Sequence, residues 1–173
     1  VGRAGQVGDA IAAAFAAEGA TVVLIARSLD DARARADDLR RAGATAHPFA
    51  CDLTDHAAVA TVAAEAGRLS GRVDALVNVA GGFAMSGPVA ASDPAILAGQ
   101  IAINVTTAYA ATRAFLPALR QTRGSIVFFS SASALPGGRV KEMSAYAIAK
   151  AGVLALMRAV AQEERVNGDR KST

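Results

Sequence analysis

Short runs of branched apolar residues alternate along this chain with longer segments of helical periodicity, and this alternation constrains the fold more than any other feature. Residues 21–26, T-V-V-L-I-A, form a continuous apolar run that is typical of a strand buried on both faces of a sheet. Further strands are predicted at residues 45–50, 73–79 and 125–129. Because strands that alternate with helices imply right-handed crossovers, we predict an α/β fold, a doubly wound parallel sheet in three α/β/α layers, as in the dinucleotide-binding Rossmann fold.

Five helical segments separate and follow these strands, and they are predicted at residues 10–18, 29–42, 55–69, 94–119 and 144–164. Thr54 or Asp55 is a natural N-cap for the third helix. The 173 residues suit one domain, and no repeat or linker divides them. We expect a strand to lead into residue 1 and further strands to follow the last helix. Residues 1–173 are therefore expected to be a single domain that lacks this first strand and the C-terminal region.

Charge and composition exclude several classes of function. The net charge is only +3 and the arginines are dispersed, so a nucleic-acid surface is not expected. The single cysteine, Cys51, allows no disulfide within the chain and fits a reducing cytoplasm. His47 and His56 lack partners at metal-ligand spacing, and no run of 18 apolar residues occurs, so we predict neither a metal site nor a membrane span.

A glycine-rich stretch, V-G-R-A-G-Q-V-G, opens the sequence with Gly2, Gly5 and Gly8. Such a loop lets the backbone approach a pyrophosphate, and the helix that follows supplies N–H donors and a positive dipole. The alternative is that the glycines simply make turns. The helix and the buried strand that follow favour phosphate binding.

The end of the strand at residues 21–26 bears on the choice of cofactor. Dinucleotide folds often place an acid there to bind the ribose 2′-hydroxyl, but here Arg27 and Ser28 follow Ala26. A guanidinium suits a 2′-phosphate, so we favour NADP over NAD, with Arg3 as a possible second phosphate partner. The nearby Asp30 keeps NAD open, and Arg27 could also be no more than a solvated charge.

Several motifs in order along the chain resemble those of the short-chain dehydrogenase/reductase family, over residues 1–164. Its compact branch carries N-N-A-G, and N-V-A-G stands here at residues 78–81. C-D-L-T-D at 51–55 resembles its adenine-contacting turn, I-N-V-T at 103–106 its helix asparagine, and F-S-S-A-S at 129–133 its serine-bearing strand end. Y-A-I-A-K at 146–150 matches Y-x-x-x-K.

Two departures from the family pattern leave alternatives open. The compact branch usually has T-G-x-x-x-G-x-G, whereas Val1 and Gln6 replace a Thr and a Gly here, and the glycine spacing is similar to that of the extended branch of epimerases and dehydratases. The family serine usually lies 13 positions before the tyrosine. Ser131 has the better strand register, with a two-residue insertion behind it, and Ser133 is the alternative.

A tyrosine has a pKa of about 10, and a nearby ammonium favours its phenolate. Tyr146 and Lys150 share one helix face, so the pair suits acid/base work. The resemblance implies Tyr146 as general acid/base, Lys150 as pKa modulator and ribose ligand, Ser131 as the group that holds the substrate oxygen, and Asn104 as the site of a relay water. It implies contacts to the cofactor from Gly2, Arg3, Gln6, Val7, Gly8, Arg27, Asp52, Leu53, Asn78, Ala80, Gly81, Tyr146 and Lys150.

The resemblance implies an NAD(P)-dependent oxidoreductase that acts on a small-molecule carbonyl or secondary alcohol, such as a 3-oxoacyl thioester, a ketone or a sugar. The alternative is a nucleotide-binding protein of the same fold without catalysis. The pocket should be lined by residues 82–85 and 134–143, and by a C-terminal lid region beyond them. Long helices with small apolar residues on more than one face predict a homo-oligomer. The resemblance implies a homotetramer or a homodimer built on these helices.

Overall fold

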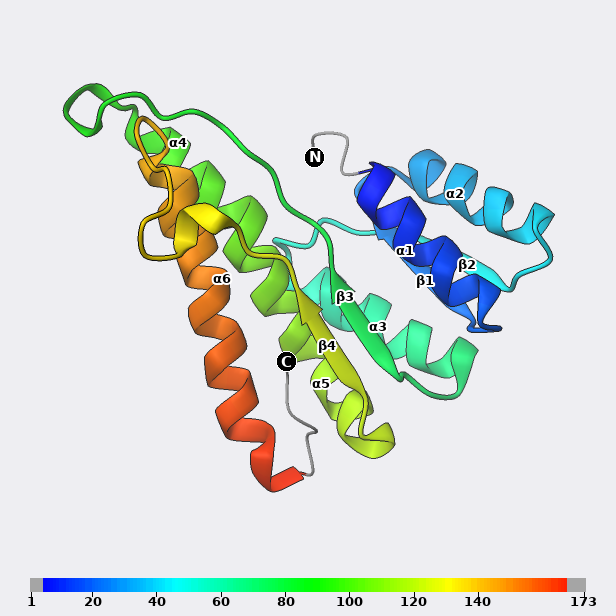
Figure 1. The fold of residues 1–173 in the computed structure, drawn as a ribbon. Coiled ribbons are helices and arrows are strands. Elements are labelled where there is room, and N and C mark those ends of the chain that lie inside the picture. The colour runs from blue at the N-terminus through cyan, green and yellow to red at the C-terminus, as the bar shows by residue number, and fades with distance from the viewer. Residues whose placement is uncertain (1–4, 168–173) are drawn as a thin grey trace.

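The computed structural model describes residues 5–167 of the chain, and it has the α/β architecture that the sequence predicts (Figure 1). Within these residues four parallel strands are present, but they form two separate pairs and not one sheet. Val22 pairs with Ala46 in the first sheet, and Ala75 pairs with Ser125 in the second. The strands are β1 (Val22–Ala26), β2 (Ala46–Ala50), β3 (Ala75–Asn78) and β4 (Ser125–Phe128).

The helices follow the predicted order, with two main differences in their bounds. The first begins at Gly5 and not at residue 10, so the end of the glycine-rich stretch is helical. The long segment from residue 94 is interrupted by a turn of π-helix, η2. The helices are α1 (Gly5–Ala17), α2 (Leu29–Arg41), α3 (His56–Ser70), α4 (Pro94–Ile101), η2 (Ala102–Thr106), α5 (Thr107–Thr122) and α6 (Ser144–Glu163), with short 3₁₀ turns η1 (Val89–Ala91), η3 (Ala132–Ala134) and η4 (Glu164–Asn167).

Local sequence signals explain where several helices begin. The Asp55 carboxylate accepts hydrogen bonds from the backbone N–H groups of Ala57 and Ala58, which confirms Asp55 as the N-cap of α3. Ser28 caps α2 in the same way through the N–H of Asp31. Asp93 caps α4, and Pro94 follows at the first helical position, where its missing N–H costs nothing.

Helices cover the strands from two sides. Ala12 of α1 and Leu39 of α2 pack with Val22 and Leu24 on one face of β1. Ala66 of α3 and Phe115 of α5 pack against the other face, where Val23, Ile25, Leu76 and Ile126 lie. Successive side chains of β1 therefore point to opposite helical layers, which is the three-layer arrangement that the sequence predicts.

The central strands are less buried than the sequence predicts. Every residue of β1 is only half-buried, although its continuous apolar run is typical of a strand enclosed on both sides. The reason is that β1 and β3 each border a large cavity along the edge that faces away from their partner strand.

Candidate active site

The pair Tyr146 and Lys150 lies in the first two turns of α6, on one face of the helix. The Nζ of Lys150 lies 5.8 Å from the centroid of the Tyr146 ring. Nζ also donates a 2.9 Å hydrogen bond to the backbone carbonyl of Phe129, directly after β4. Lys150 is 7% exposed, and its burial lowers the pKa of the ammonium from the ordinary value. The end of β4 and the first turns of α6 thus hold the buried Lys150 ammonium beside the half-buried Tyr146 phenol.

Asn104 occupies the middle of the π-helical turn η2 and is 1% exposed. Its amide nitrogen donates to the carbonyl oxygens of Gly82 and Gln100, each at 3.0 Å, and its Oδ1 accepts from the N–H of Gly82 at 3.2 Å. The side chain therefore binds the loop after β3 through both of its polar atoms. Such π-helical turns are frequent at functional sites.

Gly81 stands where the side chains of Asn104 and Lys150 converge. A Cβ added at Gly81 would lie 2.8 Å from Asn104 Oδ1 and 3.5 Å from Lys150 Nζ. The first distance is too short for a real contact, so only glycine fits there without a shift. Because Gly81 has no side chain, the Asn104 amide and the Lys150 ammonium both lie close to the backbone of the loop at this residue.

The two candidate serines lie together after β4. Ser131 caps the 3₁₀ turn η3, and its Oγ accepts hydrogen bonds from the N–H of Ser133 at 3.3 Å and from the Ser133 hydroxyl at 3.0 Å. Ser130 donates to the carbonyl of Lys150 at 3.0 Å, which joins this turn to α6. Ser131 and Ser133 therefore lie in a turn that is joined to α6, and the choice between them stays a prediction.

The two loops expected to line a substrate pocket contact each other. The carbonyl of Glu142 accepts hydrogen bonds from the N–H groups of Ser86 and Gly87 and from the Ser86 hydroxyl. Phe83 packs edge-on against Tyr146, with ring centroids 5.0 Å apart at 87°, and is itself 55% exposed. An apolar ring thus lies beside the phenol and in contact with solvent.

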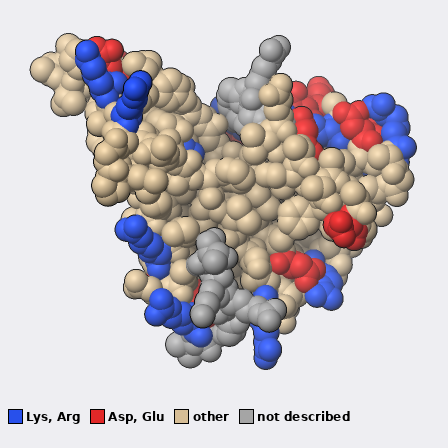
Figure 2. Space-filling model, viewed as in Figure 1, with Lys and Arg blue, Asp and Glu red and all other residues tan. Residues whose placement is uncertain are grey.

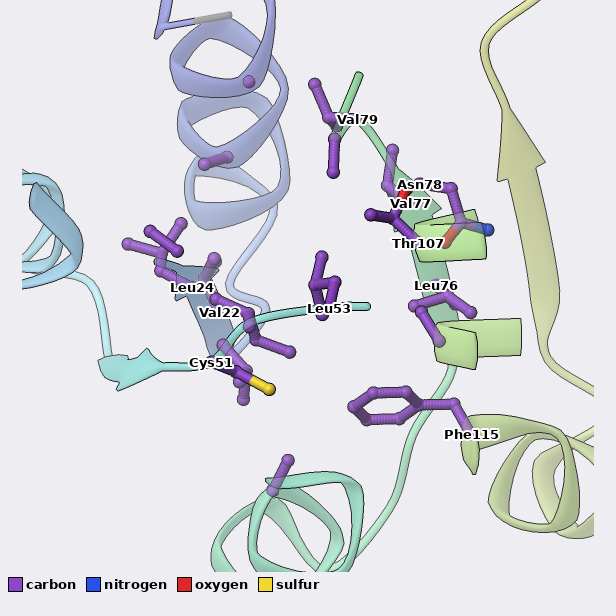
Figure 3. Close-up of a pocket in the computed structure, with 18 of the residues that line it drawn as sticks. Val22, Leu24, Cys51, Leu53, Leu76, Val77, Asn78, Val79, Thr107 and Phe115 are labelled. Atoms are coloured by element: carbon purple, nitrogen blue, oxygen red, sulfur yellow. The ribbon is translucent and has the colours of Figure 1, made fainter. Parts of the chain in front are cut away.

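The residues predicted to hold a dinucleotide lie partly around one cavity of about 1240 Å³, which runs between β1 and β3 (Figure 3). Its lining includes six of them, all near the carboxyl ends of the strands: Gly8, Arg27, Asp52, Leu53, Asn78 and Ala80. The carboxyl end of a parallel sheet is where ligands of such folds bind. Gln6 and Val7 lie in the exposed first turn of α1, and Gly2 and Arg3 lie outside the described residues.

Two of these cavity residues are already engaged by neighbouring side chains. Hydrogen bonds from the hydroxyl and the N–H of Thr54 hold the pKa of the Asp52 carboxyl below its ordinary value, and Arg27 adds a smaller electrostatic contribution. The Asn78 amide is buried and donates to the hydroxyl of Thr112 at 3.3 Å. Asn78 therefore fixes β3 to α5 through its side chain.

Sequence analysis missed two residues that shape this site, Gln100 and Ser86, whereas Phe83 lies within the range 82–85 that it expects to line the pocket. Gln100 is buried and its Oε1 accepts from Asn104 at 3.3 Å, four residues on along the helical segment. Ser86 and Phe83 lie in a loop whose partners are more than fifty residues away in sequence. The one available signal was the i, i+4 spacing of two amide side chains, Gln100 and Asn104.

Within residues 5–167 no group of three or more His, Cys, Asp and Glu side chains is placed to hold a metal ion. By length and composition α6 could cross a membrane, with a mean hydropathy of 1.3 over its most apolar 18 residues. A core helix of a soluble protein meets the same criterion, so this is weak support for a span. The buried contact of Lys150 with the end of β4 shows that part of α6 packs within the protein.

Comparison with known proteins gives one consistent result. The family model described as short chain dehydrogenase matches residues 1–168. An uncharacterised short-chain type dehydrogenase/reductase of Sinorhizobium fredii is 35% identical over 161 residues, which cover 91% of this chain and 62% of that protein. The 2-(S)-hydroxypropyl-CoM dehydrogenase 3 of Xanthobacter autotrophicus is 36% identical over 170 residues, 98% of this chain and 66% of that protein. The chain thus spans about two thirds or less of these two relatives.

Solved structures agree with this comparison. A metagenomic short-chain oxidoreductase in complex with NADP has a TM-score of 0.86 at 35% identity, covering 96% of this chain and 75% of that one. An NAD⁺-bound xylitol dehydrogenase has a TM-score of 0.88 at 27% identity, covering 96% and 64%. Neighbours of very similar fold therefore bind either nicotinamide dinucleotide.

Proposed function

The chain belongs to the short-chain dehydrogenase/reductase family, and we propose that it reduces a small-molecule carbonyl, or oxidises the corresponding alcohol, with NADP as its preferred cofactor. The observation that carries this proposal is the pairing of Tyr146 with the buried Lys150 ammonium, 5.8 Å from the ring centroid. A phenol and a cation in this relation can deliver a proton to an oxygen atom that gains charge.

Proton delivery in the proposed reaction falls to Tyr146. When a carbonyl carbon gains a hydride, its oxygen gains negative charge and takes the Tyr146 proton. The Lys150 ammonium stabilises the phenolate that is left, which lowers the cost of this step. Ser131 is proposed to donate a hydrogen bond to the same substrate oxygen, and Asn104 to hold the loop at Gly82 in place. The cofactor, when bound, supplies or accepts the hydride.

The cofactor fits the residues present. The backbone at Gly81 carries no side chain where Asn104 and Lys150 converge, so a ribose can approach these polar groups closely. Arg27 lines the cavity near Asp52 and supports a 2′-phosphate, which favours NADP. The NADP complex of one similar structure is consistent with this preference, whereas the xylitol dehydrogenase binds NAD⁺.

Assembly through α5 and α6 is part of the proposal. Tyr109 of α5 and Ile148 of α6 are 50% and 52% exposed. Both side chains are large and mainly apolar, so they leave apolar surface in contact with solvent. A second copy that packs on these helices would bury them, as in a homodimer or homotetramer. Sedimentation as a monomer at micromolar concentration would contradict this assembly.

The experiment that tests the proposed function follows NADPH oxidation with a panel of 3-oxoacyl thioesters, ketones and sugars. We expect turnover of at least one class, and we expect Tyr146→Phe to reduce it by about 10²–10⁴-fold, the range for loss of a general acid. Tyr109→Phe is the matched control, because it removes the same hydroxyl from the other tyrosine of the chain. Tight NADPH binding without any turnover would support the non-catalytic alternative, and equal rates in Tyr146→Phe would exclude the assigned mechanism.

A further inference from the structure

The helix that carries Tyr146 begins differently from its neighbours. Ser28, Asp55 and Asp93 cap α2, α3 and α4, and each accepts a hydrogen bond from an N–H group two or three residues further on. In the part of the chain that the structure describes, Met143 stands at the N-cap position of α6 and makes no capping hydrogen bond with its side chain. The first N–H groups of a helix have no acceptor within it, so a buried helix start needs one from elsewhere.

Ser86 supplies this acceptor from a loop that is 59 residues away in the sequence. Its Oγ accepts from the backbone N–H of Ala145, in the first turn of α6, at 3.5 Å. The same atom lies 3.1 Å from the hydroxyl oxygen of Ser144 and donates to the carbonyl of Glu142 at 3.2 Å. A hydroxyl has one proton to donate and two lone pairs that accept. Since the proton goes to the carbonyl, both lone pairs serve the first turn of α6, and the hydroxyl is fully used.

These contacts are buried, and the partner loop offers its backbone to them. Ser86 is 6% exposed and Ala145 is 3% exposed, so water does not readily replace their hydrogen bonds. Glu142 has a φ of 59°, which is uncommon for a residue other than glycine, and its carbonyl accepts from the N–H groups of Ser86 and Gly87. Glu142 is exposed, and Figure 2 shows charged side chains gathered at this end of the molecule, at the upper left. Its carbonyl, and not its carboxylate, makes these contacts.

The loop after β3 is therefore fixed on both sides of Phe83. Ahead of this residue, Asn104 binds the N–H and the carbonyl of Gly82. After it, Ser86 binds the start of α6, and Figure 1 shows the loop passing beside that helix. Between the two fixed points the Phe83 ring packs edge-on against Tyr146, with ring centroids 5.0 Å apart. The position of the phenol relative to this loop thus depends on the contact that Ser86 makes.

We propose that Ser86 is a positioning residue, which holds the first turn of α6 against the loop after β3 so that the Tyr146 hydroxyl faces the substrate oxygen. This inference rests on the proposed function, in which Tyr146 delivers the proton. Lys150 lies one turn further along α6 and has its own hydrogen bond to the Phe129 carbonyl. Loss of the Ser86 hydroxyl should therefore loosen the helix start and leave the ammonium in place. The expected defect is in proton delivery and not in ligand binding.

The kinetic test compares the wild type, Ser86→Ala and Ser86→Thr with NADPH and a substrate that the wild type reduces, well below the thermal midpoint of each protein. We expect Ser86→Ala to lower kcat by about tenfold to a hundredfold, because a small displacement at the reacting atoms is costly. KM should change by less than about twofold, since ground-state binding is kept. Ser86→Thr keeps the hydroxyl and should recover most of kcat.

Thr122→Val is the matched control for Ser86→Ala. The Thr122 hydroxyl also joins two segments that are far apart in the sequence, since it donates to the carbonyl of Val73, 49 residues away. This contact lies at the end of α5 and not at the start of α6. Its loss should lower stability and leave kcat unchanged.

Hydrogen exchange at the start of α6 gives a readout that does not depend on activity. Ser86→Ala should speed exchange of the Ala145 amide and its neighbours by about tenfold, because an uncapped helix start opens more often, and leave the last two turns of α6 unchanged. Ser86→Cys replaces Ser86→Ala if that variant does not fold. It keeps the volume of the side chain, and a thiol is only a weak acceptor, so the same changes are expected.

Three results would overturn the inference. Unchanged kcat together with unchanged exchange in Ser86→Ala would show that the start of α6 holds without this hydroxyl. A higher KM at constant kcat would assign Ser86 to ligand binding. An equal loss of kcat in Thr122→Val would show that lower stability, and not position, causes the defect. Absence of turnover in the wild type would count against the proposed function alone, and hydrogen exchange would then decide whether Ser86 holds the helix start.

Discussion

Lys150 makes two contacts at once, since its Nζ donates a 2.9 Å hydrogen bond to the Phe129 carbonyl and lies 5.8 Å from the centroid of the Tyr146 ring. The carbonyl at the end of β4 fixes the position of the ammonium without neutralising its charge. The cation therefore faces the phenol in a fixed geometry before any ligand arrives. Such preorganisation is what makes a charge effective at a reacting atom.

The buried ammonium predicts how stability changes with pH. Burial lowers the pKa of Lys150 in the folded chain below the ordinary 10.5. Between the lowered value and 10.5 the unfolded chain binds the proton and the folded chain does not, so stability rises with pH in that window. Below the lowered value the lysine is charged in both states and its contribution is constant. We expect Lys150→Met to remove this rise.

The measurement is the thermal midpoint as a function of pH for the wild type, for Lys150→Met and for Lys141→Met. Lys141 is the other lysine in the described residues and is exposed, so its loss should leave the rise intact. A rise of the same size in Lys150→Met would mean that another group causes it.

The close approach of Asn104 to Gly81 predicts that one added methyl group lowers both stability and NADPH binding. In Gly81→Ala the new Cβ would lie 2.8 Å from Asn104 Oδ1, so Asn104 must move away from Gly82. We expect a loss of about 1–3 kcal/mol in the free energy of unfolding, as for other overpacked sites, together with weaker NADPH binding. Urea denaturation and a fluorescence titration measure the two effects.

A matched control for Gly81→Ala is Gly67→Ala inside α3, where a Cβ meets nothing within 4 Å. Alanine is the better helix former, so this change should stabilise the chain by about 0.5–1 kcal/mol. If Gly81→Ala behaved like Gly67→Ala, the close approach at Asn104 would have no consequence.

The sequence predicts those parts of the structure that depend on neighbours in the chain. Asp55 is confirmed as a cap because its partners lie two and three residues away. Tyr146 and Lys150 share a face because four residues make one helical turn. The π-helical turn could not be predicted, since Asn104 binds Gly82, which is 22 residues away. The split into two sheets was missed for the same reason, because strand pairing depends on which edges meet in space.

Arg27 predicts the cofactor preference. Its guanidinium lines the cavity near Asp52 and is proposed to bind the 2′-phosphate, which only NADP carries. Arg27→Ala should weaken NADPH binding by about tenfold to a hundredfold, the usual cost of a lost charge-assisted hydrogen bond, and leave NADH binding unchanged. Arg33→Ala, which removes an exposed arginine of α2 paired with Asp30, is the control. Equal losses for both cofactors would assign Arg27 a role other than phosphate recognition.

An ion pair between Arg120 and Glu164 joins the end of α6 to α5. It predicts that two similar arginine substitutions lower the thermal midpoint by different amounts. Arg120 donates two hydrogen bonds to Glu164, at 2.8 and 2.6 Å, and the Glu164 side chain is only 7% exposed. Arg68 makes the same two-bond contact to Glu65, but on the exposed surface of one helix. Removing Arg120 deprives a buried carboxylate of this partner, whereas Glu65 can be solvated by water. Arg120→Met should therefore lower the thermal midpoint clearly more than Arg68→Met, and acid should narrow the difference, because protonation of the carboxylates removes the charge that Arg120 balances. Equal midpoints at neutral pH would show that the pair does not hold α6 in place.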